Sequence, residues 1–158
     1  MASRSSVSLR AFRVADPRHS LFDGQGAYLK GGRWNSPGRR IIYAAESYAG
    51  ALLEVLVHLN FDEIPRGYAW TEVRLPSSAI EELSSNSIPN WNSDDLTATR
   101  SFGDAWHEQK RSMALLVPSL VTAGIERNVL INQDHPAFSA IQTGNVNEVI
   151  WDERLFRE

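Results

Sequence analysis

The chain has 158 residues, of which 42% are hydrophobic and 22% charged, and its formal net charge is -3. These values are close to the averages for globular proteins and favour one folded domain over a disordered or fibrous chain. The slightly acidic balance excludes the overall basic surface of most nucleic-acid-binding proteins, so we expect no direct nucleic-acid ligand.

Cysteine is absent, which excludes disulfides, thiolate nucleophiles and cysteine metal sites and fits a reducing compartment. No apolar run approaches the roughly 18 residues of a transmembrane helix. The first residues, MASRSSVSLR, lack the apolar core of a signal peptide. We therefore predict a cytoplasmic protein without a membrane partner.

Short segments rich in β-branched and aromatic residues, and bounded by Gly, Pro, Asn or Ser, predict strands. They cover residues 7–14, 40–45, 68–75, 113–118, 128–132 and 147–151. In the third segment, YAWTEVRL, strict alternation predicts one buried and one exposed face. Ala69, Thr71, Val73 and Leu75 share one of these faces.

Apolar residues at helical spacing predict a helix over 47–60 that begins at Ser47 as N-cap, and a second over 97–110. The polar segment 84–95 between them reads as a loop. Strands outnumber helices and do not alternate regularly with them. We predict an α+β protein: a single compact domain over 1–158 with mostly antiparallel sheets and flanking helices, in which residues 1–8 form a loosely ordered extension.

A lone carboxylate stands in the most apolar segment, ALLEVLVHLN (51–60). On a helix, Glu54 and His58 share a side that Leu53 and Val57 flank, so we expect that side to be covered by other parts of the protein. An ionised Glu buried there would cost several kcal/mol unless a cation or several donors met it. The pattern therefore predicts either a partner for Glu54 or a small water-filled cleft beside it.

The segment LKGGRWNSPGRR (29–40) is dense in glycine and in cations. Gly31 and Gly32 permit close approach of the backbone to a ligand, and the cations favour an anion such as a pyrophosphate. Those cations are Lys30, Arg33, Arg39 and Arg40. The residue types alone leave a second interpretation open, a hairpin loop with solvated cations and a structural Arg33–Glu54 salt bridge.

The long segment GGRWNSPGRRIIYAAESYAGALLEVLVHL (31–59) closely resembles the signature of the RES domain, a family of toxins from bacterial toxin-antitoxin pairs. Later blocks resemble the family in the same order: GDAW (103–106), LLVPSLV (115–121), NVLIN (128–132), HP (135–136) and DERLF (152–156). The resemblance runs from Leu9 to Phe156. It implies a fold similar to that of ADP-ribosyltransferase toxins, and either NAD degradation by water or phosphate or ADP-ribosylation of a protein.

By the same resemblance, the catalytic residues are Glu54, Arg33 and Ser119, and Arg33, Tyr43 and Ser119 bind NAD. From their place in the glycine-rich segment, Gly32 and Tyr28 are added to the NAD-binding residues. A carboxylate near the ribose can stabilise an oxocarbenium-like transition state. The fixed donor fork of Arg33 suits a pyrophosphate, and the ring of Tyr43 suits stacking on nicotinamide. NAD is then a consumed substrate, with no cofactor and no metal.

Three further residues have weaker assignments. For His58, a hydrogen bond that orients Glu54 and a satisfied core histidine both stay open, while Asn128 and His135 are interpreted as loop-stabilising residues. Tyr28 and Trp34 flank the glycines and are expected to wall the pocket.

The resemblance also implies a partner, an antitoxin with a helix-turn-helix DNA-binding domain that blocks the pocket. The rival without catalysis is an inactive module that only binds this antitoxin. Other enzyme classes lack their motifs. No histidine pair has metal-site spacing, LVPSLV has no nucleophile elbow, and DGQGAY (23–28) has only two of the three Rossmann glycines.

Overall fold

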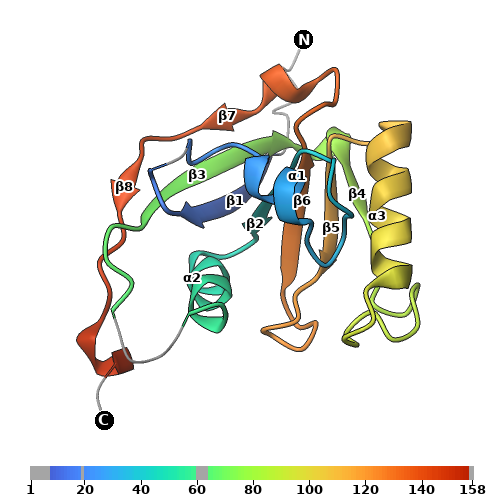
Figure 1. Cartoon of the computed structure of the whole chain (residues 1–158). Helices are drawn as coiled ribbons and strands as arrows, with labels where there is room; N and C mark the ends of the chain where they lie inside the picture. The colour runs from blue at the N-terminus through green and yellow to red at the C-terminus, as the bar shows by residue number, and fades with distance from the viewer. Residues whose placement is uncertain (1–7, 19, 60–63, 157–158) are drawn as a thin grey trace.

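The computed structural model describes residues 8–18, 20–59 and 64–156 of the chain. Its strands form one eight-stranded sheet with helices beside it, which confirms the predicted α+β class (Figure 1). The strands are β1 (Ser8–Ala15), β2 (Ile41–Ala45), β3 (Ala69–Pro76), β4 (Ile80–Glu82), β5 (Ala114–Pro118), β6 (Arg127–Asn132), β7 (Gln142–Thr143) and β8 (Asn147–Glu148). The helices are α1 (Gln25–Lys30), α2 (Tyr48–Val57) and α3 (Thr97–Gln109).

The sheet order is β4-β5-β6-β2-β1-β3-β7, and β8 also pairs with β3. All pairings are antiparallel except that of β4 with β5. The two halves of the sheet meet at a narrow junction, because β1 pairs with β2 only through Phe12 and Ala45. By contrast, β1 pairs with β3 along its whole length and β2 with β6 along its whole length. At this junction the two strands diverge on either side of a single residue pair.

The predicted strands are confirmed with small shifts of their ends, except that the 147–151 segment is a strand only at Asn147–Glu148. Three elements were not predicted: α1, β4 and β7. Each has six residues or fewer, too short for a periodic pattern to show. The first strand already begins at Ser8, and residues 1–7 of the expected extension lie outside the described residues, as does Asn60 at the predicted end of the long helix.

Both faces of the sheet centre are covered. In β5 the side chains alternate between two apolar clusters, so that Leu115 and Val117 face the cluster that contains Trp106 of α3. Ala114 and Leu116 face the other cluster. All five residues of β5 are buried, which explains why this strand reads as a continuous apolar run. Along β3, the predicted alternation is confirmed, with every second residue buried.

Helix α2 begins as predicted, because the Ser47 hydroxyl accepts a hydrogen bond from the Gly50 amide at 2.9 Å. One side of α2 packs against Phe12 and Val14 of β1. The opposite side is open, since Leu53 is 43% and Val57 56% exposed. The expectation that α2 is covered on most sides is therefore wrong, because no segment of the described chain lies over that face.

In the part of the chain that the structure describes, no helix has the length and apolar character needed to cross a bilayer.

Candidate functional site

A cavity of about 530 Å³ lies at the junction of β1 and β2. Much of its wall comes from the end of β1, the 31–34 loop, β2 and one side of α2, and further lining residues come from α1, the end of β5 and β6. The polar and charged lining residues are Arg13, Asp16, Asp23, Arg33, Tyr43, Glu54, His58, Tyr68 and Asn128. The cleft predicted beside Glu54 is thus present.

Glu54 lines this cavity from the middle of α2. Its Oε1 atom accepts a hydrogen bond from Asn128 Nδ2 at 2.9 Å and a longer one from the Ser119 hydroxyl at 3.4 Å. Among the described residues, no cation forms an ion pair with Glu54. Both predicted explanations for a carboxylate in this helix are present, because two donors meet Glu54 and it lines a cavity.

Arg33 lines the same cavity but makes its contacts elsewhere. Its Nη1 atom donates to the carbonyl oxygens of Trp91 at 3.0 Å and Ser93 at 2.7 Å. The Arg33–Glu54 salt bridge considered from the sequence is therefore wrong. The Arg33 guanidinium instead connects the 84–95 loop to the cavity wall. Only its Nη1 atom is used in these two bonds, and the guanidinium has further N–H donors.

Tyr43 presents its ring to the cavity while its hydroxyl is engaged by the 32–35 loop. The hydroxyl donates to Asn35 Oδ1 at 2.6 Å and accepts from the Trp34 amide at 3.2 Å. Burial raises the pKa of Tyr43 well above its usual value, so the hydroxyl stays protonated. The ring face, rather than the hydroxyl, is what Tyr43 offers to a ligand.

Arg13 is a cavity residue that the sequence analysis missed. Its side chain donates to the carbonyl oxygens of Tyr43 at 2.9 Å and Leu21 at 3.2 Å. Burial lowers the pKa of Arg13 to about 10, an effect that the nearby Asp23 carboxylate partly opposes. A charged residue within the otherwise apolar part of β1 was the available signal, the same signal that pointed to Glu54.

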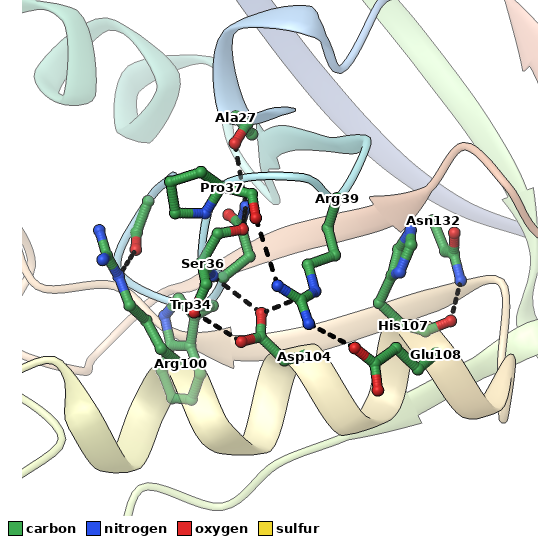
Figure 2. Close-up of polar contacts among 12 residues, drawn as sticks. Ala27, Trp34, Ser36, Pro37, Arg39, Arg100, Asp104, His107, Glu108 and Asn132 are labelled. Atoms are coloured by element: carbon green, nitrogen blue, oxygen red, sulfur yellow. Dashed lines mark hydrogen bonds and ion pairs between the residues drawn. The ribbon is translucent and has the colours of Figure 1, made fainter. Parts of the chain in front are cut away.

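Helix α3 holds the 31–40 loop in place (Figure 2). The Asp104 carboxylate accepts from the Ser36 amide at 2.8 Å and from the Ser36 hydroxyl at 2.6 Å. Arg100 Nε donates to the Gly32 carbonyl at 2.9 Å. Arg39 pairs with both Asp104 and Glu108 on the same helix. These contacts fix the wall that carries Arg33.

The other cations expected to attract an anion therefore lie outside the cavity. Arg39 is neutralised by two carboxylates of α3. Arg40 lies over the ring of Tyr28, with its Cζ atom 4.4 Å from the ring centroid. Neither Lys30 nor Tyr28 is among the cavity residues, so the structure does not place Tyr28 where it would touch a ligand there.

The remaining candidates divide clearly. Ser119 is 2% exposed and reaches the site only through Glu54. His58 is exposed at the end of α2, so the core-histidine interpretation is wrong, and it makes no hydrogen bond to Glu54 within the described chain. His135 stabilises a turn, as predicted, because its Nδ1 accepts from the Ala137 amide at 3.0 Å. Trp34 is buried and lines the cavity.

The arrangement joins two guanidinium groups, an aromatic ring and a carboxylate in one concave site. Such a site suits a ligand that has both an anionic part and a part on which positive charge develops. In the described residues, no group of three or more acidic or histidine side chains is arranged to hold a metal ion.

The fold and this cavity define a small α+β domain whose pocket gathers two arginines, aromatic side chains and the carboxylates of Asp16, Asp23 and Glu54. Residues 10–152 match the RES domain family, and the chain belongs to that family. It is similar to a Sphingobium protein named "Prs ADP-ribosylating toxin", with 36% identity over 98% of this chain and 96% of that protein. It is also 38% identical to "Toxin Res" of Photorhabdus laumondii, over 72% of this chain and 73% of that toxin.

Among solved structures, the chain is similar to one in the crystal structure of the M. tuberculosis MbcT-MbcA toxin-antitoxin complex. The TM-score is 0.72 with 19% identity, over 91% of this chain and 85% of that one. At this identity the likeness concerns the fold alone, and it agrees with the α+β class.

Proposed function

We propose that this chain is a toxin enzyme that consumes NAD by cleaving the bond between nicotinamide and ribose. The observation that carries the proposal is the Glu54 carboxylate, which lines a cavity with Arg13 and Arg33 and has no cation paired to it among the described residues. The names of its relatives support the class of activity.

The cavity fits a dinucleotide in size, and it contains two arginines. Its volume of about 530 Å³ lies within the range of roughly 300 to 1,000 Å³ that is usual for small-molecule sites. Arg13 and Arg33 would hold the pyrophosphate, and the ring face of Tyr43 would pack on the nicotinamide. Gly32 forms part of the cavity wall next to Tyr43, where it has no side chain to take up space.

Glu54 would act on the charge that develops during bond cleavage. The bond between ribose C1′ and the pyridinium nitrogen breaks, and its electron pair moves to that positively charged nitrogen. The leaving group is therefore neutral nicotinamide. The ribose carbon becomes oxocarbenium-like, and a nearby carboxylate stabilises it. An acceptor oxygen then bonds to C1′ and loses its proton to solvent.

For the acceptor, we propose water or phosphate, which makes the enzyme an NAD glycohydrolase or phosphorylase. A protein acceptor is the second candidate, and the name of the Sphingobium relative, an ADP-ribosylating toxin, favours it. An inactive binding module is less well supported, because Arg33, Tyr43 and Glu54 line one cavity and the Ser119 hydroxyl donates to Glu54.

We further propose that a cognate antitoxin with a helix-turn-helix domain neutralises the enzyme in the cytoplasm, where NAD is available to it. The toxin-antitoxin complex in the similar solved structure supports a protein partner of this kind. Mixing purified toxin and candidate antitoxin tests the pairing. A partner that binds stoichiometrically and suppresses NAD consumption supports it, and a partner that leaves consumption unchanged contradicts it.

The test of the enzyme is proton NMR of NAD incubated with the purified protein, with and without phosphate. We expect release of free nicotinamide, and a loss of activity of about 100-fold or more in Glu54→Ala, as for removal of a transition-state charge partner. Glu54→Ala should fold normally. Glu148→Ala, which removes an exposed carboxylate on the sheet edge, is the matched control and should retain activity.

The product identifies the acceptor. Free ADP-ribose indicates water, ADP-ribose 1-phosphate indicates phosphate, and label transferred to protein indicates ADP-ribosylation. NAD that stays intact with the wild-type protein under all of these conditions would contradict the proposal.

A further inference from the structure

We propose that Asn128, rather than Ser119, is the residue that positions the Glu54 carboxylate for its reaction. This inference rests on the proposed role of Glu54, but it concerns a residue interpreted from the sequence only as loop-stabilising. Asn128 lines the cavity and is joined to Glu54 across 74 residues of sequence.

The two donors to Glu54 differ in strength. The distance from Asn128 Nδ2 to Glu54 Oε1 is 2.9 Å, in the middle of the range for an N–H···O bond. The Ser119 hydroxyl is 3.4 Å from the same atom, beyond the roughly 2.5 to 3.0 Å of a good O–H···O bond. The Asn128 bond is therefore the one that fixes the orientation of the carboxylate.

Asn128 is held by strands on both sides. It lies in β6, in the middle of the sheet, where it pairs with Val117 of β5 on one side and with Ala45 of β2 on the other. A donor fixed by two neighbouring strands gives Glu54 a rigid reference point.

The direction of the bond has a chemical consequence. An amide nitrogen donates only, so Asn128 requires the Glu54 Oε1 atom as its hydrogen-bond acceptor. Both bonds go to Oε1, and no hydrogen bond to Oε2 occurs within the described chain. The second oxygen is thereby left for the cavity, where a developing positive charge would be placed.

Asn128→Asp is the sharpest test, because it changes one nitrogen to oxygen with almost no change of shape. The substitution sets a second carboxylate against Glu54, and two adjacent carboxylates do not readily ionise together. We expect the pair to retain one proton near neutral pH. NAD consumption at pH 7.5 should fall at least about 10-fold, with the acid limb of the pH–rate profile moved up by about one unit or more.

Other groups that titrate in the cavity are the same in both proteins, so the difference between the two profiles reports on position 128. These groups are Arg13, Asp16, Asp23, Arg33, Tyr43, His58 and Tyr68. Asn86→Asp, at an exposed position in the 84–95 loop, is the matched control for the added charge and should leave the profile unchanged.

A readout that needs no NAD separates this inference from the proposed function. Carbon NMR of the side-chain carboxylates, with Glu54 assigned from Glu54→Gln, follows its titration directly. A Glu54 midpoint that rises in Asn128→Asp supports the contact, even if the wild-type protein leaves NAD intact. An unchanged midpoint, in a protein that does consume NAD, overturns the inference and leaves the enzyme assignment standing.

A second variant guards against a folding defect in Asn128→Asp. Asn128→Leu keeps a similar volume in β6 and removes the donor without adding charge. We expect its kcat to fall at least about 10-fold with little change in KM, because the carboxylate loses its orientation and the binding residues stay. Equal kcat in a folded Asn128→Leu protein would contradict the positioning role.

Discussion

Gly32 lies directly against the hydroxyl of Tyr43, so closely that a Cβ atom on residue 32 would be 2.5 Å from the hydroxyl oxygen. The phenol cannot easily move away, because it is bonded to Asn35, which is fully buried. Gly32→Ala should therefore displace either the ring or the loop. We expect a loss of about 1 to 3 kcal/mol in the free energy of unfolding and a roughly 10- to 100-fold loss of NAD consumption.

The matched control for this prediction is Gly144→Ala. There the nearest atom to an added Cβ is a backbone oxygen of Glu72 at 3.6 Å, which is an ordinary contact. Thermal unfolding and NAD assays on both variants check the prediction. Similar stability and activity in the two proteins would show that the 32–35 loop adapts to a methyl group.

Arg33 links the cavity to the 84–95 loop through one nitrogen that serves two carbonyl oxygens. Arg33→Lys keeps the positive charge but loses the planar fork, so it cannot hold both carbonyls and a phosphate group together. We expect KM for NAD to rise about 10-fold or more, and amide exchange to quicken around Trp91 and Ser93.

Hydrogen-exchange mass spectrometry and steady-state kinetics measure these two effects. Arg74→Lys is the control, because Arg74 is exposed and pairs only with Glu72 at the surface. If Arg33→Lys matches the control in both amide hydrogen exchange and KM for NAD, the guanidinium fork is not needed at this position.

His107 makes the fold sensitive to acid. It is 8% exposed, its Nε2 lies 3.1 Å from Asp134 Oδ2, and its Nδ1 is buried without a hydrogen-bond partner. Burial lowers the pKa of His107 below its ordinary value of 6.5, with Arg39 adding to this and Asp134 and Glu108 opposing it. As the pH falls below 6.5, the unfolded chain takes up a proton that the folded chain resists, so stability falls.

The comparison that isolates this effect is the wild-type protein against His107→Gln. As the pH drops from about 7 towards 5, we expect the unfolding free energy of the wild type to decrease relative to that of His107→Gln. Denaturant unfolding at several pH values measures it, and the other histidines are common to both chains. A difference that is constant with pH, or that favours the wild type in acid, would contradict the prediction.

Much of the local structure was readable from the residues. Ser47 was predicted as the N-cap of the long helix, and its hydroxyl accepts the expected backbone hydrogen bond. The alternation in 68–75 was confirmed by burial in β3. Both patterns depend on neighbours within a few residues, so the sequence contains the whole signal. Glu54 was singled out for the same reason, because it interrupts an apolar helix.

The contacts of the site were less predictable. Arg33 was expected to face Glu54, yet it binds the carbonyls of Trp91 and Ser93. Asn128 was interpreted as a loop-stabilising residue, yet it donates to Glu54. These partners are far apart in sequence, and no local periodicity records which side chains meet when the strands are brought together.

The sequence by itself determined the α+β class, the main strands and helices, and the one carboxylate that needed an explanation, because propensity and periodicity act over short distances. Only the tertiary structure decided that the sheet narrows to a single residue pair between β1 and β2, and that a cavity forms there. It also decided that Arg13 and Asn128 belong to this cavity. The physical reason is that strand order and the closure of α2 over the junction are set by long-range packing.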